Sequence, residues 1–297
     1  MSEPLAGTLV KYSESKLALF ESGDLSSKSV VIFIGGLTDG LATVGYVPAL
    51  SKRLEANGWS LAQITLQSSY YQFGMHTLED DADDIEDAVE YLKTKRGKEK
   101  IILFGHSTGC QDAMWYLTVH LGSRVSVDAA ILQAPVSDYD FVNHAASPEI
   151  HRWAEEARRI TDTSVTKDEW MPREASLSLA NALGSGETPY TAYRFASLFH
   201  PRGDDDFFSE GIPSEELAFK LSQKPMLLLL CNSDESYPPT LASREAKEKL
   251  LERWIRASEG TIDKLSTVIE GANHTVDDPE ASERMLDVVI EFLKTVE

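Results

Sequence analysis

The chain has 297 residues, 42% of them hydrophobic and 26% charged, and its formal net charge is −20 at pH 7. That length can bury one large α/β core or two small ones, and the composition is that of an ordinary globular protein. A chain this negative should repel nucleic acid and anionic membranes, so we expect it to bind neither. No stretch approaches the ~18 apolar residues of a membrane span.

The two cysteines, Cys110 and Cys231, fall within predicted core elements. Buried free thiols are typical of a reducing compartment, whereas a disulfide framework would indicate secretion. Residues 1–4 have neither the basic region nor the apolar stretch of a secretory signal, and residues 294–297 match no targeting signal. We therefore expect a cytoplasmic protein. The sequence does not predict its oligomeric state.

Strands and helices alternate over most of the chain. Apolar, β-rich runs predict strands at residues 8–12, 16–20, 30–34, 60–66, 100–104, 129–132, 226–231 and 265–269. Helical periodicity predicts helices near residues 47–56, 78–95, 111–121, 243–257 and 279–296. This alternation is typical of a mostly parallel sheet covered by helices on both faces, with an active site at the carboxyl ends of the strands.

Residues 137–223 break the alternation. They contain helical runs near 149–161 and 174–183 and an aromatic-rich stretch at 190–199, with no convincing strand. We interpret them as a mainly helical cap inserted between two parts of the core, residues 1–136 and 224–297. Large aromatic side chains give the cap apolar surface for a pocket, although most of them are expected to pack it against the core: Trp153, Trp170, Tyr190, Tyr193, Phe195, Phe199, Phe207 and Phe208.

Acidic residues are concentrated in two places. Seven acids fall between Glu79 and Asp87, at the start of a predicted helix, where negative charge complements the helix dipole. A metal site there is a weak alternative, because these acids lie on several helix faces and no EF-hand glycine pattern accompanies them. The second cluster, Asp204, Asp205 and Asp206, is expected to be a solvated loop.

Residues 105–109 form the G-x-S-x-G sequence Gly105-His106-Ser107-Thr108-Gly109, between a predicted buried strand and a predicted helix. A nucleophile elbow requires this context, because its serine projects from a sharp strand-to-helix turn. The glycines let neighbouring backbone approach the turn, and the helix N-terminus lies beneath the serine. Ser107 is therefore the candidate nucleophile. The alternative is a surface serine that caps the helix.

Candidate partners for Ser107 follow in the chain order serine, acid, histidine. Asp234 lies on the loop after the seventh predicted strand, and His274 lies on the loop after the eighth. A histidine in that place can accept the Ser107 proton while an acid holds its other ring nitrogen. Asp138, after the sixth predicted strand, competes with Asp234 for the role of the acid, and Glu235 is a weaker candidate.

An oxyanion hole needs backbone N–H groups aimed at the developing negative charge. One donor should be the N–H of Thr108, the residue after the nucleophile, and the second should come from the loop after an early strand. Residues 35–40 form such a loop, in which the N–H of Leu37 is the candidate and that of Gly36 is next. This loop lacks both a G-x-x-x-x-G-K-[ST] pattern and a basic residue, so phosphate binding is not favoured.

The elbow, with Asp234 and His274 in these positions, resembles the α/β-hydrolase superfamily. More narrowly, residues 34–40 (IGGLTDG) joined to residues 105–112 (GHSTGCQD) resemble the fungal siderophore-esterase family. The resemblance covers nearly the whole chain, from about Gly7 to about Phe292. It implies an α/β-hydrolase fold with a helical cap, and it implies these site residues: Ser107, His274 and Asp234 as the triad, with Gly36, Leu37 and Thr108 lining the oxyanion hole.

Members of that family cleave ester bonds of fusarinine-type hydroxamate siderophores inside the cell, so the resemblance implies an esterase for such a small-molecule ester. The chemistry needs no metal or organic cofactor, and iron would enter only as part of a ferric siderophore substrate. Thioesterases, lipase-like or peptidase-like enzymes and acyltransferases share the constellation, and so do some hydrolase-fold receptors. The −20 charge further predicts a preference for an unacetylated siderophore, which carries protonated amines, over its N-acetylated analogue.

Overall fold

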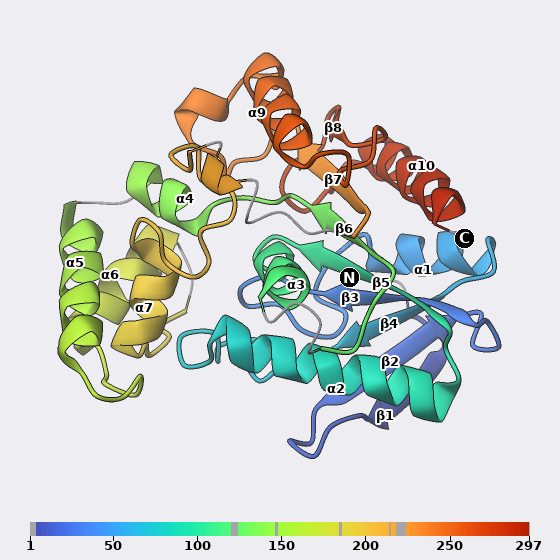
Figure 1. Cartoon of the computed structure of the whole chain (residues 1–297), viewed down its shortest axis with the longest axis horizontal. Helices are drawn as coiled ribbons and strands as arrows, with labels where there is room; N and C mark the ends of the chain where they lie inside the picture. Colours follow the sequence, from blue (N-terminus) through green and yellow to red (C-terminus); the bar gives the residue numbers. More distant parts are fainter. Residues whose placement is uncertain are drawn as a thin grey trace.

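The computed structural model describes residues 4–119, 124–145, 148–183, 186–213, 215–217 and 224–296. Its eight strands form one sheet in the order β1-β2-β4-β3-β5-β6-β7-β8. β2 pairs antiparallel with both β1 and β4, and every pairing from β4 to β8 is parallel. The mostly parallel sheet predicted from the alternating pattern is confirmed (Figure 1).

Each predicted strand is present, with ends that differ by a few residues. The bounds are β1 Gly7–Lys11, β2 Ala18–Gly23, β3 Ser29–Ile34, β4 Ser60–Ile64, β5 Lys100–His106, β6 Ala129–Gln133, β7 Met226–Cys231 and β8 Thr267–Ile269. The central strands are apolar over most of their length because helices cover both faces of the sheet.

Side chains of the central strands alternate between two hydrophobic cores. In β3, Val30 and Ile32 pack in one core, whereas Val31 and Phe33 pack in the other. The first core also holds residues of α2 (Leu78–Arg96), α3 (Gly109–Thr118) and α9 (Arg244–Ala257). The second core holds residues of α1 (Val47–Glu55) and α10 (Pro279–Thr295). Two helical layers therefore enclose the sheet.

The helix ends differ little from the predicted ones. α3 begins at Gly109, two residues earlier than expected, and the last residues of that prediction, 120 and 121, lie outside the described residues. α2 begins with a capping box between Thr77 and Asp80. Of the acids that follow, Asp81 and Asp84 are buried. The acidic cluster therefore has a buried side that faces the core, in addition to its role at the helix N-terminus.

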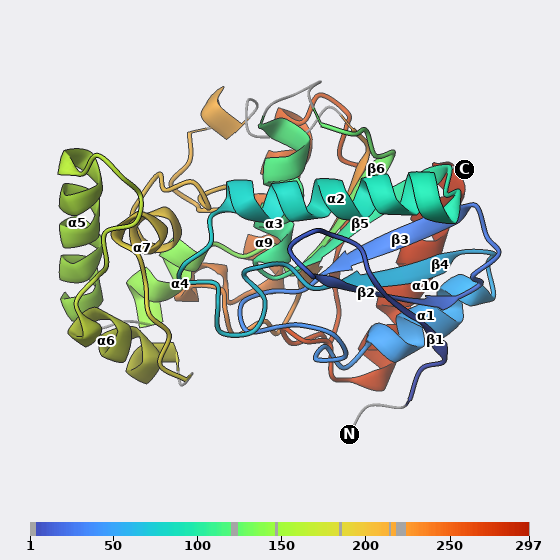
Figure 2. The same ribbon diagram turned by 90° about the horizontal axis from the view of Figure 1, so that it is seen from below.

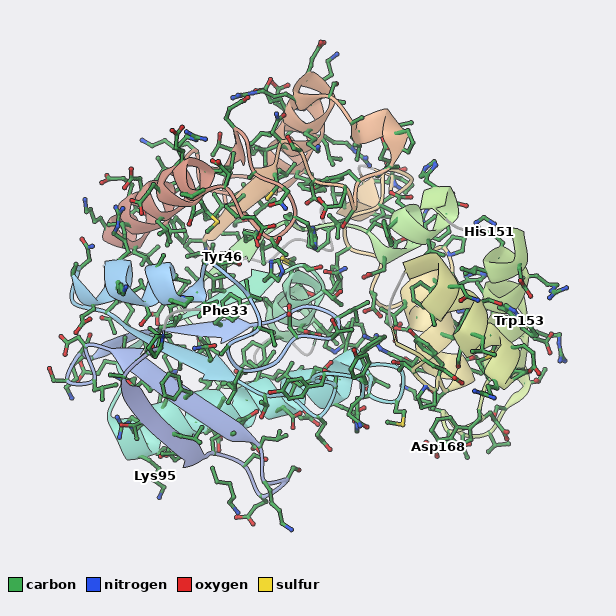
Figure 3. The ribbon with its side chains drawn as sticks, turned by 180° about the vertical axis from the view of Figure 1, so that it is seen from behind. Phe33, Tyr46, Lys95, His151, Trp153 and Asp168 are labelled. Atoms are coloured by element: carbon green, nitrogen blue, oxygen red, sulfur yellow. The ribbon has the colours of Figure 1, made fainter. Side chains whose placement is uncertain are left out.

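Between β6 and β7 lie the helices α4 Asp138–Ala145, α5 Pro148–Thr163, α6 Arg173–Leu183 and α7 Ala192–Phe199. α5, α6 and α7 correspond to the two predicted helical runs and the aromatic-rich stretch, whereas α4 was not predicted. The four helices gather at one end of the molecule, away from α1 and α10 (Figure 2). In Figure 3, Phe33 and Tyr46 lie in the core, and His151, Trp153 and Asp168 mark this helical group.

The helical group has a small core of its own, which includes Phe195, Phe199 and Tyr190. Most of the large aromatic residues that we expected to pack are buried, although Trp170 is 56% exposed. Trp170 forms an isolated antiparallel bridge with Thr191, and the described residues of this segment contain no strand longer than that.

Arg194 ties the helical group to the rest of the molecule. Its side chain is 1% exposed, and its Nη1 lies 2.5 Å from Asp205 Oδ2. Its Nε donates to the carbonyl oxygen of Phe73, in the segment between β4 and α2, at 3.0 Å. Asp205 also accepts a hydrogen bond from Ser197 Oγ at 2.5 Å. The prediction of a solvated loop at Asp204–Asp206 is therefore wrong. Asp205 and Asp206 are buried, and Asp205 pairs with a buried guanidinium.

We predict that Arg194→Ala destabilises the fold far more than Arg53→Ala does. Removing Arg194 leaves Asp205 buried without its cation, which costs about 3–5 kcal/mol. Arg53 forms ion pairs with Glu283 and Asp287, whose side chains are 62% and 66% exposed. Breaking such surface pairs costs about 0–1 kcal/mol. Urea unfolding of both variants measures the difference, and equal losses would contradict the role of Arg194.

Candidate active site

The site is built around a left-handed turn at Ser107. β5 ends at His106, Ser107 has φ +53°, and α3 begins at Gly109. A Cβ on Gly105 would lie 2.3 Å from the carbonyl oxygen of Gly109, and a Cβ on Gly109 would lie 2.4 Å from that of Ile34. Only glycine allows the strand, the turn and the helix to approach so closely. The turn therefore presents Ser107 at the carboxyl end of β5, as the G-x-S-x-G pattern requires.

Three of the predicted residues meet at this turn. His274 Nε2 lies 2.8 Å from Ser107 Oγ. On the other side of the ring, His274 Nδ1 lies 2.9 Å from Asp234 Oδ1 and 3.0 Å from Oδ2. This is the geometry of a nucleophile, a base and an orienting acid.

The two competing acids lie elsewhere. Asp138 Oδ2 accepts a hydrogen bond from Gln111 Nε2 at 2.8 Å, and no hydrogen bond joins Asp138 to His274 among the described residues. Glu235 Oε2 accepts from the backbone N–H of His274 at 3.2 Å, so it contacts the loop and not the ring. The acid that faces the imidazole is Asp234.

The environment of His274 favours its protonated form. Burial lowers the pKa of His274, but the hydrogen bond and the charge of Asp234 outweigh this effect, and the net shift is upward. The Asp234 carboxylate is itself oriented by the backbone N–H of Ser236, which donates to Oδ1 at 2.9 Å. The pair therefore has the arrangement in which a carboxylate orients an imidazole and stabilises its protonated form.

Three residues that the sequence did not single out support His274. His106 is the residue before Ser107 in the elbow, and its ring centroid lies 5.3 Å from that of His274. Its Nδ1 is hydrogen-bonded to Oε1 of Gln133, which also accepts from Tyr46. The Nε2 of Gln133 donates to the carbonyl oxygen of His274 at 3.2 Å. These contacts join residues far apart in the sequence, so no local pattern could reveal them.

His106 is kept neutral in this position. Burial and the charge of His274 lower the pKa of His106 to about 4. A neutral ring at this site avoids a second positive charge next to the His274 imidazolium, which like-charge repulsion would disfavour.

The loop after β3 lies against the nucleophile. The N–H of Gly36 donates to Asp39 Oδ2 at 2.9 Å, so this amide is already occupied. The N–H groups of Leu37 and Thr108 form no hydrogen bond within the described part of the chain. Of the three predicted oxyanion donors, the geometry therefore favours Leu37 and Thr108, and it corrects the expectation for Gly36. Gly36 instead provides space, because a Cβ there would lie 2.7 Å from the Cβ of Ser107.

A cavity of about 200 Å³ opens beside Ser107. Its described lining residues come from six places: the loop after β3, the segment between β4 and α2, the elbow, the chain after β6, the helical group and the Asp234 loop. They are Leu37, Thr38, Phe73, Ser107, Thr108, Val136, Asp138, Phe141, Phe199 and Ser236. Half of these residues are apolar, and Asp138 is the one residue of the set that can carry a charge. Because α4 and α7 contribute Phe141 and Phe199, the helical group covers part of the site.

Both cysteines, Cys110 and Cys231, are buried and free, as expected. Within the described ranges, no group of three or more His, Cys, Asp or Glu residues is placed to hold a metal ion. None of the helices in those ranges combines the length and the apolar character needed to cross a membrane.

The family model described as "Protein of unknown function (DUF1749)" matches residues 1–294. The chain belongs to this family. A UPF0613 protein of Schizosaccharomyces pombe is 32% identical over 99% of this chain and 99% of its own length. The fusarinine C esterase sidJ of Aspergillus fumigatus is 29% identical over 94% of this chain and 92% of its own.

Solved structures agree with the fold. The siderophore hydrolase EstB of Aspergillus fumigatus has a TM-score of 0.80 and 27% identity, and the match covers 99% of this chain and 98% of EstB. Est1E of Butyrivibrio proteoclasticus, solved with ferulic acid, has a TM-score of 0.60 at 16% identity over 97% of this chain and 98% of its own. The predicted α/β-hydrolase fold is confirmed. Among the relatives are esterases, which gives the family an esterase-like character.

We predict that Gly36→Ala abolishes reaction at Ser107 without unfolding the protein. Its new Cβ would lie 2.7 Å from the Cβ of Ser107 and 3.2 Å from its Oγ, which displaces the β3 loop or the nucleophile. Gly45→Ala is the matched control, because a Cβ at Gly45 meets nothing within 4 Å. Ester hydrolysis and circular dichroism of both variants test this, and a fully active Gly36→Ala enzyme would refute it.

We also predict that kcat/KM falls in acid with an apparent pKa above 6.5, the usual value for histidine. His274 acts as a base only when neutral, and its pKa is raised in this site, so activity is present at high pH and lost as the pH falls through that value. Asp234→Asn removes the hydrogen bond to the carboxylate and the charge of Asp234, the two largest effects that raise the pKa of His274, so the residual activity should fall off at a lower pH. An apparent pKa at or below 6.5 for the acidic limb of the wild-type kcat/KM profile would contradict this account.

Proposed function

We propose that the protein is a serine esterase that acts on a small-molecule ester. The observation that carries the proposal is the unbroken series from Ser107 Oγ through the His274 ring to Asp234, at 2.8 Å and 2.9 Å. Two unoccupied backbone amides and an apolar cavity adjoin the same hydroxyl. Esterases among the relatives support the same reaction class.

In the proposed reaction, Ser107 Oγ attacks the ester carbonyl carbon while His274 Nε2 takes its proton. The carbonyl oxygen becomes an oxyanion that accepts hydrogen bonds from the Leu37 and Thr108 amides. His274 then gives its proton to the departing alcohol, and the acyl group remains on Ser107. Water, deprotonated by His274, attacks this acyl-enzyme, and Ser107 leaves with the proton as the acid is released. Asp234 keeps the imidazole oriented in both halves.

As a substrate we propose a fusarinine-type hydroxamate siderophore. The names of two relatives, fusarinine C esterase and siderophore hydrolase, support this choice at 29% and 27% identity. Iron would be carried by the substrate and take no part in ester cleavage. A cytoplasmic location remains part of the proposal, supported by two free buried thiols.

We predict that Ser107→Ala folds normally and lowers ester turnover by about 10⁴-fold or more, as loss of a triad member does. Asp234→Asn should produce a severe loss in the same assay, and Asp138→Asn a smaller one, because only Asp234 faces the imidazole. The measurements are hydrolysis of fusarinine C followed by mass spectrometry and labelling of Ser107 by a fluorophosphonate.

The same measurements separate the rival outcomes. Labelling without turnover of any ester would indicate a receptor on a hydrolase fold. Turnover of thioesters or amides in place of fusarinine C would retain the serine mechanism and reject the substrate. A severe loss confined to Asp138→Asn would overturn the assignment of the acid.

A further inference from the structure

Asp138 is a buried carboxylate that the proposed ester cleavage does not use. It is the first residue of α4, where the chain leaves β6 for the helical group. It is 9% exposed and lines the cavity that also contains Ser107. The imidazole of His274 is already held by Asp234, so Asp138 is left without a part in the reaction.

Few groups in the protein compensate its charge. Gln111 Nε2 donates to Asp138 Oδ2 at 2.8 Å, and Asp138 forms no ion pair with another described residue. The nearby guanidinium of Arg194 is engaged with Asp205 and with the carbonyl oxygen of Phe73. Asp138 therefore has one neutral side-chain donor and a carboxylate at the cavity wall.

The apolar part of that wall makes this arrangement costly for a free carboxylate. Leu37, Phe73, Val136, Phe141 and Phe199 line the same cavity, and apolar surroundings disfavour an ionised acid. Burial, followed by the charge of Asp205, raises the pKa of Asp138 to about 7, while Arg194 and His274 act in the opposite direction. A cation bound in the cavity would stabilise the ionised form.

We propose that Asp138 binds a protonated amine of the substrate and so makes the enzyme prefer esters that carry an ammonium group over neutral esters of the same shape. This proposal rests on the proposed esterase function and adds a specificity residue to it. The contact is local, between one carboxylate at the cavity wall and one ammonium group of the substrate. It is distinct from long-range attraction of the substrate by the −20 charge of the chain. Salt screens that attraction at distances beyond the Debye length, which is about 8 Å at physiological ionic strength.

The test uses two p-nitrophenyl esters that differ only in charge: the 6-aminohexanoate, which ends in an ammonium, and the heptanoate, which ends in a methyl of similar size. The quantity measured is the ratio of their kcat/KM values. Asp138→Asn should lower this ratio about tenfold or more, the range seen for close charge pairs in a desolvated site. The fall should persist in 0.5 M NaCl, where ~4 Å of screening length remains.

Asp140→Asn is the matched control. Asp140 lies on the same helix and is also buried, but it accepts from the Glu210 backbone N–H at 2.8 Å and does not line the cavity. The ratio should be the same in this variant as in the wild type. A similar fall in both variants would show a general effect of acidic charge and overturn the role of Asp138.

The ratio should also depend on pH. It should be high above about pH 7, where Asp138 is ionised, and fall below it as the carboxylate takes up a proton. Charged groups that face Asp138 from other elements are Arg194 on α7, Asp205 on the following loop and His274. Protonation of His274 affects both esters alike and cancels in the ratio. Asp138→Asn should remove this pH dependence.

The outcomes distinguish this proposal from the one it rests on. Equal loss on both esters, or an unchanged ratio in Asp138→Asn, would overturn the role of Asp138 and leave the esterase in place. Failure of the wild-type enzyme to hydrolyse either ester, together with no labelling of Ser107 by a 6-aminohexyl or a heptyl fluorophosphonate, would overturn the esterase proposal and this one with it.

Discussion

The close approach of backbone at the elbow is the constraint on which the rest of the site depends. Gly109 lies so near the carbonyl oxygen of Ile34 that a Cβ would be 2.4 Å away, which fixes the start of α3 against the end of β3. This close approach accompanies the left-handed conformation of Ser107, φ +53°, at the carboxyl end of β5. It also brings the β3 loop beside the nucleophile. The loops after β7 and β8 then need only to supply Asp234 and His274 at the same edge.

A second constraint is electrostatic and lies where the helical group meets the core, around Arg194. Burial lowers the pKa of Arg194, but the negative charges of Asp205, Asp81 and Asp112 outweigh this effect and raise it. One buried guanidinium therefore offsets the charge of several carboxylates. Burial raises the pKa of Asp81 to about 7, and burial together with the charge of Asp81 raises that of Asp112. Some of the acidic side chains are therefore buried, where their charges and that of Arg194 join the helical group to the core.

Prediction from sequence worked where the signal is local and periodic. All eight strands, the elbow and the two loops that hold Asp234 and His274 follow from apolar runs and their order. α4 was missed because DYDFVNHA is short and contains weak helix formers. It depends on packing, such as that of Val142 in the core of the helical group. The burial of Asp205 depends on Arg194, and the occupied amide of Gly36 depends on Asp39. Specific side-chain pairings of this kind leave no periodic pattern in the sequence, so they could not be predicted from it.

The segment between β6 and α4 contacts both α3, which follows Ser107, and the loop that holds Asp234. Tyr237 Oη donates to the carbonyl oxygen of Pro135 at 3.0 Å, and Gln111 Nε2 donates to that of Val136 at 3.0 Å. Gln111 belongs to the helix that follows the nucleophile, and Tyr237 belongs to the loop of Asp234. The same two elements that position the reacting groups therefore position Asp138 at the cavity wall. We expect substitutions in α4 beyond Asp138 to reshape the cavity without moving Ser107, Asp234 or His274, because these anchors precede the helix.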